Sequence, residues 1–330
     1  MSRCYAFNGD ADGLCALQQL RLAGPRAAAG RETLVTGVKR DIALLDRVAA
    51  SASAGDACTV LDVSLDVNRA GLTALLDRGV SVRYFDHHFA GEIPAHPGLE
   101  AHIDLSPSVC TSLIVNRTLD GRFRPWAIVG AFGDSMTAEA DALVHAVGLA
   151  PDVAARLKAL GIAINYNAYG ETIADLHVPP VELAAEMLPF VDPMEFAETS
   201  AACKRLADGF RDDMELAKRL TPAREAPGAV VFMLPDAAWA RRASGTFAND
   251  KAKAHDGSAI AIVSPKTDGG FLVSVRVPRD FSVSAEAFCR RFPTGGGRKT
   301  AAGINHLPSE ELENFATAFE QQFRVGISTT

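Results

Sequence analysis

Acidic and imidazole side chains stand at the ends of four separate apolar stretches of this sequence. A single Asp after a strand is ordinary, because it commonly caps a helix or turns the chain. Acidic or imidazole residues after four such stretches indicate a shared site. The carboxyl ends of parallel strands meet at one edge of a sheet, and ligands bind at that edge. The set is Asp10 and Asp12 after residues 5–7, Asp62 after 58–61, Asp86, His87 and His88 after 80–85, and Asp134 after 126–132.

Four aspartates gathered in one cleft would repel one another unless positive charge compensates them. Two divalent cations would supply that charge to Asp10, Asp12, Asp62 and Asp134, and His87 would add a nitrogen ligand. A carboxylate and imidazole set without thiolate suits Mn²⁺ best, with Mg²⁺ or Co²⁺ as substitutes. Paired cations activate a shared water and stabilise the attacking and leaving oxygens at phosphorus. The predicted chemistry is therefore hydrolysis of a phosphoester or a phosphoanhydride.

The elements that must position these residues alternate between short apolar runs and helical patterns over roughly the first 190 residues. This alternation is typical of βαβ units, so we expect an α/β catalytic domain with a mainly parallel sheet. Predicted strands cover residues 5–7, 34–36, 58–61, 80–85 and 126–131. Predicted helices cover residues 13–22, 66–78, 141–170, 180–190 and 195–220.

A second, smaller α+β domain is expected after a linker at residues 221–228, which contains Pro and Gly. The predicted domains are a catalytic domain at 1–195, a connecting helix and linker at 196–225, and a substrate-binding domain at 226–330. Within the last, predicted strands cover residues 229–234, 259–263 and 270–277, and predicted helices cover 239–255, 284–292 and 310–323.

Four ordered motifs resemble those of the DHH phosphoesterases. They are NGDADG at residues 8–13, LDVS at 61–64, DHH at 86–88 and GAFGD at 130–134. Each motif alone is weakly specific, but in this order, and with a glycine motif near the C-terminus, they cover nearly the whole chain. The family includes RecJ-like exonucleases, nanoRNases and phosphoadenosine-phosphate phosphatases, cyclic-dinucleotide phosphodiesterases, exopolyphosphatases and family II pyrophosphatases. The resemblance implies a DHH catalytic domain followed by a DHH-associated substrate-binding domain.

The resemblance also implies a role for each acidic residue of the motifs. Asp62 would bridge two metal ions, and Asp10 would bind the first of them. The second ion would lie on Asp12, His87 and Asp134.

Two further motif residues would act beside the metal ligands. By the same resemblance, Asp86 would be a carboxylate behind the metal shell that orients an imidazole. His88 would face the substrate phosphate, although a histidine stacked on the cleft wall without touching substrate is the alternative. Asp104 opens a Ser-rich segment and is expected to serve as a turn and cap residue.

The first motif departs from the pattern of several branches of the family. Those branches have a histidine ligand four residues before the first aspartate, and this chain has Ala6 there. The first metal is therefore expected to lack a ligand. It would be weakly held, completed by Asn8 or water, or recruited with substrate. Asn8 itself is either a residue behind the metal shell or simply a turn residue ahead of Gly9.

The glycine motif GGGRKTAAG at residues 295–303 resembles the Gly-Gly-Gly-His motif of the DHH-associated domain, with Arg298 in place of the histidine. Gly295, Gly296 and Gly297 precede an expected helix start, where backbone N–H groups can hold an anion. A guanidinium can grip a phosphate through two parallel hydrogen bonds. Arg276 would add a second cation. The alternative is a tight structural turn.

Composition and charge exclude several classes of protein. The net charge is −7, and it is uneven: residues 226–330 hold 12 Lys and Arg against 10 Asp and Glu, which leaves 21 against 30 in the first 225 residues. Such an acidic body argues against binding to long duplex nucleic acid. No apolar run is long enough to span a membrane, and the six cysteines show no CxxC spacing. A cytoplasmic enzyme is expected.

The predicted function is a two-metal phosphoesterase acting on dinucleotides, short oligonucleotides or nucleoside bisphosphates. Substrate would lie between the two domains, with its reacting phosphate on the metals and its distal part held by the glycine motif. An exopolyphosphatase is the alternative enzyme, and a catalytically weak nucleotide-binding sensor is the alternative of a different class. The polar and aromatic cluster NYNAYG at residues 165–170 has no assigned role, and a homodimer is left open.

Overall fold

The computed structural model describes residues 2–24 and 32–324. The chain divides into two compact units, Met1–Phe210 and Arg211–Thr330, and each is considered by itself. The division falls inside helix α10, Ala201–Lys218, between the ends at residues 195 and 226 that the sequence predicts for the two domains.

The first unit is built on a five-stranded, entirely parallel sheet with strand order β2-β1-β3-β4-β5. Phe7, Leu61 and Phe85 pair across the three central strands, so these strands end level with one another. The predicted α/β fold with a parallel sheet is confirmed. The strands are β1 (Arg3–Phe7), β2 (Glu32–Val35), β3 (Ala57–Leu61), β4 (Ser81–Asp86) and β5 (Leu99–Ile103).

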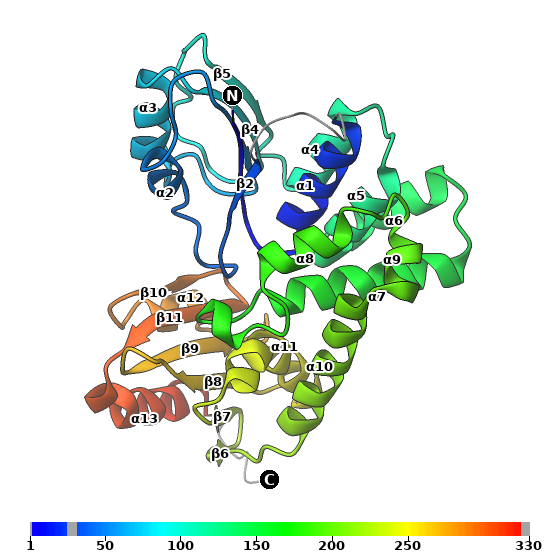
Figure 1. Ribbon diagram of the computed structural model, residues 1–330. Coiled ribbons are helices and arrows are strands. Elements are labelled where there is room, and N and C mark those ends of the chain that lie inside the picture. Colours follow the sequence, from blue (N-terminus) through cyan, green and yellow to red (C-terminus); the bar gives the residue numbers. More distant parts are fainter. Residues whose placement is uncertain (1, 25–31, 325–330) are drawn as a thin grey trace. The chain divides into compact units, whose positions relative to one another are not determined.

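Helices cover both faces of this sheet (Figure 1). On one face, α2 (Leu45–Ala49) and α3 (Arg69–Asp77) enclose an aliphatic core with the strands. On the other face, α1 (Ala11–Ala23), α4 (Thr111–Thr118) and α5 (Arg124–Gly133) form a larger core that includes Trp126. Two-sided coverage explains why successive residues at the carboxyl ends of the central strands are buried, namely Ala6 and Phe7, Val60 and Leu61, and Tyr84 and Phe85.

Further helices extend the larger core. Pro stands at the first turn of several of them, where its missing N–H costs no hydrogen bond. No helix among the described residues has the length and apolar character needed to cross a membrane. These helices are α6 (Thr137–Ala146), α7 (Pro151–Asn167), the 3₁₀ turn η1 (Ile173–Asp175), α8 (Pro180–Met187) and α9 (Pro193–Thr199).

The prediction of a strand at residues 126–131 is wrong, because this segment lies in helix α5. Every residue from Trp126 to Phe132 is buried, since α1, α4 and α7 surround the helix. A helix that is apolar on all sides has no polar stripe, so its sequence cannot be told from a buried strand by periodicity. Asp134 therefore follows a helix and not a strand.

Other parts of the sequence prediction need correction. The helix predicted at 141–170 is two helices, because α6 ends at Ala146 and α7 begins at Pro151. The helix predicted at 195–220 is broken at Ser200, whose extended backbone ends α9 and whose Oγ accepts from the N–H of Cys203 to start α10. The edge strand β5 was not predicted. The predicted linker at 221–228 contains strand β6 (Arg224–Ala226), which turns through Gly228 into β7 (Ala229–Met233).

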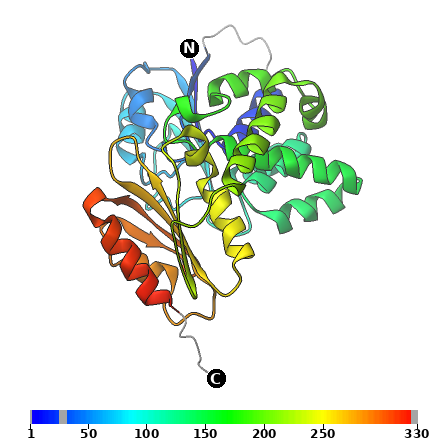
Figure 2. The same cartoon turned by 90° about the horizontal axis from the view of Figure 1, so that it is seen from below.

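The second unit has a six-stranded mixed sheet of order β10-β11-β9-β8-β7-β6. Helix α13 packs on one face with α12, and α11 packs on the other (Figure 2). A phenylalanine cluster, including Phe288, Phe315 and Phe319, fills the α12–α13 side. The remaining elements are β7 (Ala229–Met233), α11 (Ala238–Ala254), β8 (Ala259–Pro265), β9 (Phe271–Arg276), α12 (Ala285–Cys289), β10 (Gly295–Gly297), β11 (Ala301–Leu307), η2 (Ser309–Glu311) and α13 (Leu312–Phe323).

Candidate metal centre

The acidic residues of the first three motifs meet at the carboxyl edge of the parallel sheet. The switch point of the sheet lies between β1 and β3. From β1 the chain continues through α1 to β2 on one side, and from β3 it continues through α3 to β4 on the other side. Ligands of doubly wound folds bind outside this switch point. Asn8, Asp62 and Asp86 occupy the ends of β1, β3 and β4 there, and Asn8 and Asp62 donate backbone N–H bonds to the neighbouring strand.

Asp10 begins helix α1 as its N-cap. Its Oδ1 accepts from the backbone N–H groups of Asp12 and Gly13, each at 3.1 Å. Its Oδ2 forms an ion pair with Lys39. Burial alone would raise the pKa of Asp10, but the charge of Lys39 and the N–H of Gly13 outweigh it and lower that pKa.

Asp12 lies in the first turn of α1 and is buried. Its two oxygens accept 2.7 Å hydrogen bonds from the backbone N–H groups of Thr111 and Ser112, at the start of α4. A helix N-terminus favours negative charge, so α4 stabilises this carboxylate. Cys110 at the N-cap position offers no capping bond of its own, and Asp12 therefore caps α4 across space.

Asp62 has a left-handed backbone conformation, with φ of 61°. A non-glycine residue held there costs about 1–3 kcal/mol, and such strain is concentrated at functional sites. Thr111 Oγ1 donates a 3.1 Å hydrogen bond to Asp62 Oδ1. Burial, followed by the charges of the neighbouring carboxylates Asp10, Asp12 and Asp134, raises the pKa of Asp62 well above its ordinary value.

The orientation of His87 is fixed by a backbone carbonyl. Its Nδ1 lies 2.9 Å from the oxygen of Val109, which can only accept, so Nδ1 carries the proton. Its Nε2 then lies 3.5 Å from Asp62 Oδ1 and 3.8 Å from Asp134 Oδ2. An imidazole that donates from one nitrogen and turns the other toward carboxylates has the arrangement of a metal ligand.

His88 pairs with Asp86 through Nδ1, and the same nitrogen lies 3.9 Å from Asp62 Oδ1. Its Nδ1 lies 2.7 Å from Asp86 Oδ1, and Asp86 is completely buried. The imidazole predicted to be oriented by Asp86 is thus that of His88. Burial lowers the pKa of His88, but the hydrogen bond and charge of Asp86 outweigh it and raise that pKa. The His88 side chain is 46% exposed, which leaves it accessible from solvent.

Asp134 enters the site from the carboxyl end of α5. Gly133 permits a close approach of α5 to the start of α1, since a Cβ there would lie 2.3 Å from the Cβ of Ala11. This contact brings Asp134 beside Asp12. Burial and then the charges of Asp12 and Asp10 raise the pKa of Asp134 to about 7, against the lowering effect of Lys39.

Lys39 is a site residue that the sequence analysis missed. It follows β2, so it stands at the same sheet edge as the acidic residues. Besides the ion pair with Asp10, its Nζ lies 3.9 Å from Asp134 Oδ1 and donates to Asn165 Oδ1 at 3.0 Å. It also lies 5.5 Å from the ring centre of Tyr169. Its signal in the sequence is a cation shortly after the predicted strand at residues 34–36.

Two groups of side chains among the described residues offer ligand atoms close enough to share an ion. One is Asp12, His87 and Asp134, and the other is Asp62, His87 and His88, with the atoms of each group within 4.8 Å of one another. Both groups contain His87, and neither contains Asp10.

Two buried oxygens without hydrogen-bond partners also favour a bound cation. Asn8 Oδ1 and Asp86 Oδ2 are buried and have no hydrogen-bond partner among the described residues. A buried acceptor without a donor is costly, and a cation would satisfy it. The oxygen and nitrogen donors present, without thiolate, suit Mn²⁺ or Mg²⁺. The site residues therefore fit a divalent ion.

The glycine motif lies in the second unit as a hairpin, and the helix start expected there is wrong. Gly295–Gly297 forms strand β10, which pairs with β11 through a turn closed by Arg298 and Ala301. Two of these positions have no room for a side chain. A Cβ on Gly295 would lie 1.9 Å from Cys289 O, and a Cβ on Gly297 would lie 2.4 Å from Ala302 Cα. Gly296 has open space around it.

The two predicted arginines share the end of the second sheet that carries this hairpin turn. Arg276 pairs in register with Ala301 and donates from Nε to Asn249 Oδ1 at 2.8 Å. Arg298 is exposed at the turn. The structure thus places Arg276 and Arg298 near one another in the fold, while their contact with substrate stays a prediction.

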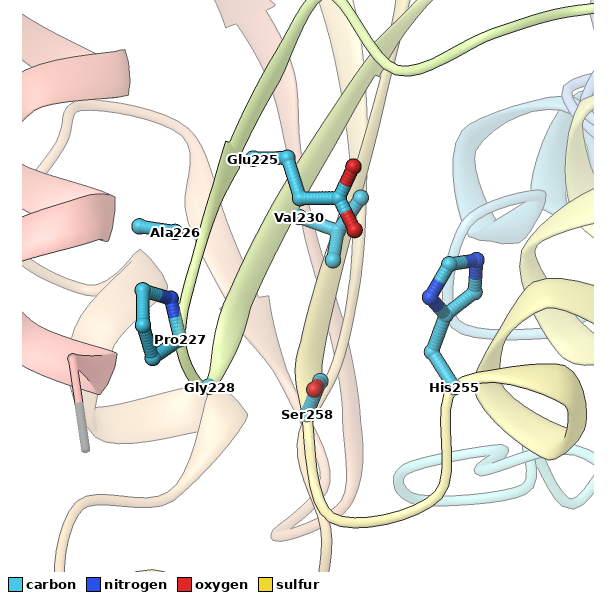
Figure 3. A pocket seen from close by; sticks show the side chains of 7 residues that line it. All are labelled: Glu225, Ala226, Pro227, Gly228, Val230, His255 and Ser258. Atoms are coloured by element: carbon cyan, nitrogen blue, oxygen red, sulfur yellow. The ribbon is translucent and has the colours of Figure 1, made fainter. Parts of the chain in front are cut away.

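A separate pocket in the second unit holds none of the predicted site residues (Figure 3). Glu225 and His255 line it from opposite sides, beside the β6–β7 turn. It lacks the converging carboxylates of the sheet edge in the first unit. We therefore assign the candidate centre to the first unit.

Comparisons with known proteins bear on the fold. No family model matches the sequence, and no curated protein matches it. Among solved structures, it is similar to an exonuclease RecJ bound to manganese, with a TM-score of 0.59 and 18% identity, over 97% of this chain and 89% of that one. It is also similar to RecJ from Thermus thermophilus in complex with Mn²⁺, with a TM-score of 0.60 and 19% identity, over 97% of this chain and 51% of that one.

A third similar structure is the DHH domain of a protein described as a member of a family of ribosomal proteins. The TM-score is 0.64 and the identity 12%, over 98% of this chain and 87% of that one. Identities this low show the fold alone. The chain has the fold of DHH-domain proteins, as the four motifs predicted.

The clustered carboxylates predict that the metal-free protein becomes less stable to unfolding as the pH rises. The pKa of Asp134 is about 7 when folded and about 3.9 when unfolded. Between these values the folded chain binds more protons, so the free energy of unfolding falls as pH rises. The raised pKa values of Asp62 and His88 act in the same direction.

We expect the Tm of chelator-treated protein to fall from about pH 5 to about pH 8, by roughly 2–4 °C for each kcal/mol lost. Added Mn²⁺ should restore more stability at the higher pH, where the ligands are ionised. Calorimetry with and without Mn²⁺ measures both effects, and Asp134→Asn should flatten the metal-free profile. A Tm of the metal-free protein that rises over this range would contradict the assignment.

Proposed function

We propose that this chain, which has the DHH fold, is a metal-dependent phosphoesterase that hydrolyses short oligonucleotides, dinucleotides or nucleoside bisphosphates. The observation that carries the proposal is the setting of His87. Its Nδ1 is held by Val109, and its Nε2 faces carboxylates on both sides. A cation between these groups would bind one imidazole and two carboxylates, which arrive from the ends of β4, β3 and α5.

We place a divalent cation, Mn²⁺ for preference, on Asp12, Asp62, His87 and Asp134. The resemblance implies a second ion beside Asp10. When bound, such an ion activates water and stabilises charge that develops on the phosphoryl oxygens. The neighbouring structures of RecJ bound to manganese support this choice of metal.

Residues around the ligands would hold the reacting groups. Thr111 fixes the rotamer of Asp62 through its hydroxyl. Asp86 keeps a proton on His88 Nδ1, so Nε2 of a protonated His88 would donate to a phosphate oxygen or to the leaving oxygen. Despite burial, the hydrogen bond and charge of Asp86 raise the pKa of His88, which favours the protonated imidazole.

An exposed aromatic residue next to His88 in the chain favours a nucleotide substrate over polyphosphate. Phe89 directly follows His88 and is 70% exposed. Its backbone oxygen accepts from Ser64 Oγ at 2.7 Å, which fixes this part of the chain beside β3. A base can stack on such a ring, and a phosphate chain gains nothing from it.

The Asp62→Asn variant tests the centre. We expect turnover to fall at least ~10²-fold at saturating Mn²⁺, because the amide weakens a ligand that the site holds in a strained conformation. Release of nucleotide from a dinucleotide, followed by chromatography, measures it. Asp77→Asn, an exposed change on α3, is the matched control. Turnover near that of the unmodified chain would refute the role of Asp62.

Removal of metal should stop activity by itself. We expect Mn²⁺ to restore hydrolysis better than Ca²⁺, because Ca²⁺ prefers more oxygen ligands and longer bonds than a site with an imidazole provides. The measurement is activity after chelation and readdition of each ion, with bound metal counted. Equal restoration by Ca²⁺ would argue against a compact Mn²⁺ site.

The hairpin of the second unit would bind a substrate phosphate other than the one that is hydrolysed. Substitution of Arg298 tests this role. If Arg298 grips that phosphate through two hydrogen bonds, Arg298→Lys should lower kcat/KM by roughly 10- to 150-fold, mainly through KM, since an ammonium lacks the planar fork. A substrate with one phosphate should be less affected.

Gly296→Ala separates substrate contact from hairpin structure. An added Cβ meets nothing within 4 Å, and the backbone there needs no left-handed conformation, so the fold should tolerate it. A raised KM with an unchanged Tm would indicate close approach of substrate to this backbone. Full kcat/KM in Gly296→Ala and in both Arg298→Lys and Arg298→Ala would leave the hairpin a structural turn.

A further inference from the structure

We propose that Lys39 takes the place of one divalent cation, so that the centre holds a single metal ion beside a fixed ammonium. The inference rests on the proposed function only in taking Asp12, Asp62, His87 and Asp134 as the metal ligands. It differs from the two-ion site that the motifs imply, and it gives Lys39 a role in charge compensation.

The first observation is that both carboxylate oxygens of Asp10 already have partners. Its Oδ1 accepts from two backbone N–H groups at the start of α1, and its Oδ2 pairs with Lys39. Asp10 belongs to neither group of metal-capable side chains among the described residues. A second ion on Asp10 would have to displace the ammonium or lie against it.

The second observation is that strand β1, which leads to Asp10, offers no imidazole. Ala6 stands where several branches have a histidine ligand, and it is buried in the aliphatic core with Leu44 and Val60. The oxygens left for a second ion on the Asp10 side are those of Asp10, Asp62 and Asn8. The His88 imidazole, whose Nδ1 lies 3.9 Å from Asp62 Oδ1, is already paired with Asp86.

The third observation is that Lys39 is held in place on several sides. Its backbone N–H donates to Ala168 O at 2.9 Å, and its Nζ donates to Asn165 Oδ1. The ring of Tyr169 adds a cation–π contact. The side chain is only 23% exposed. The NYNAYG cluster, which had no assigned role in the sequence, thus positions this lysine.

Close packing of two loops completes the arrangement. A Cβ on Gly9 would lie 2.2 Å from the oxygen of Gly37, so only glycine at position 9 lets the Lys39 loop approach the first motif. The approach brings the ammonium to Asp10 directly. A surface lysine that paired by chance would need no such fit between backbones.

Charge compensation is consistent with one ion. Lys39 and one divalent cation bring three positive charges to the four carboxylates. The N-termini of α1 and α4 supply further partial positive charge to Asp10 and Asp12. The ammonium would then stabilise charge on the phosphate from the Asp10 side, where the absent ion would otherwise act.

Counting bound metal tests the proposal without relying on activity. Metal-free protein is titrated with Mn²⁺ in equilibrium dialysis, and the saturated sample is measured by electron paramagnetic resonance. One ion per chain with the spectrum of isolated Mn²⁺ is expected. Two ions with an exchange-coupled spectrum would overturn the inference and leave the proposed function standing. Absence of bound Mn²⁺ would overturn the proposed function and the inference with it.

Lys39→Ala frees Asp10 and tests exclusion directly. This variant should bind a second Mn²⁺, whereas Arg40→Ala, which removes the same charge from an exposed neighbour, should still bind one. A Lys39→Ala chain that binds a single ion would show that Lys39 excludes nothing. When Mn²⁺ is limited to one ion per chain, kcat/KM of Lys39→Ala should be roughly 10²-fold lower than that of the unmodified chain. Full activity under this condition would overturn the role of Lys39 in catalysis.

Discussion

Mutual repulsion among buried carboxylates at one sheet edge is the constraint on which the rest of the first unit depends. Asp10, Asp12 and Asp62 are buried at the switch point between β1 and β3, and Asp134 lies against them. Like charges so placed are unstable without compensation. The fold supplies it from the ends of helices, from the Lys39 ammonium and from a site suited to a divalent cation.

The backbone of the first unit is shaped by this requirement. Asp62 accepts a left-handed conformation at the end of β3, where a relaxed turn would direct its side chain elsewhere. Gly133 and Gly9 allow, respectively, a helix and a loop to come within contact of the first motif. Each of these features is costly or restrictive for folding alone. Together they bring carboxylates and a lysine to one point.

The sequence predicted the parts of the site that depend on strand ends. Strands β1, β3 and β4 were found because their apolar runs are short and end on polar residues, and level register then brings Asp62 and Asp86 together. The approach of α5 could not be predicted, since a helix buried on every side has the pattern of a strand. The strand-end argument for Asp134 was therefore wrong, and its place at the site was predicted correctly only by its motif. Lys39 was missed because its role depends on the contacts of Asn165 and Tyr169, distant in sequence.

A lysine and a metal ion are not equivalent compensators, and the difference assigns separate tasks to the two sides of the site. An ammonium is a compact single charge that cannot polarise water as a divalent ion does. Activation of water would therefore belong to the side of Asp12, His87 and Asp134, where metal ligands converge. The Asp10 side would hold a phosphate oxygen by charge and hydrogen bonding. Because Lys39 is part of the chain, that half of the site would be complete before metal arrives, and the dependence on metal would reflect one binding event.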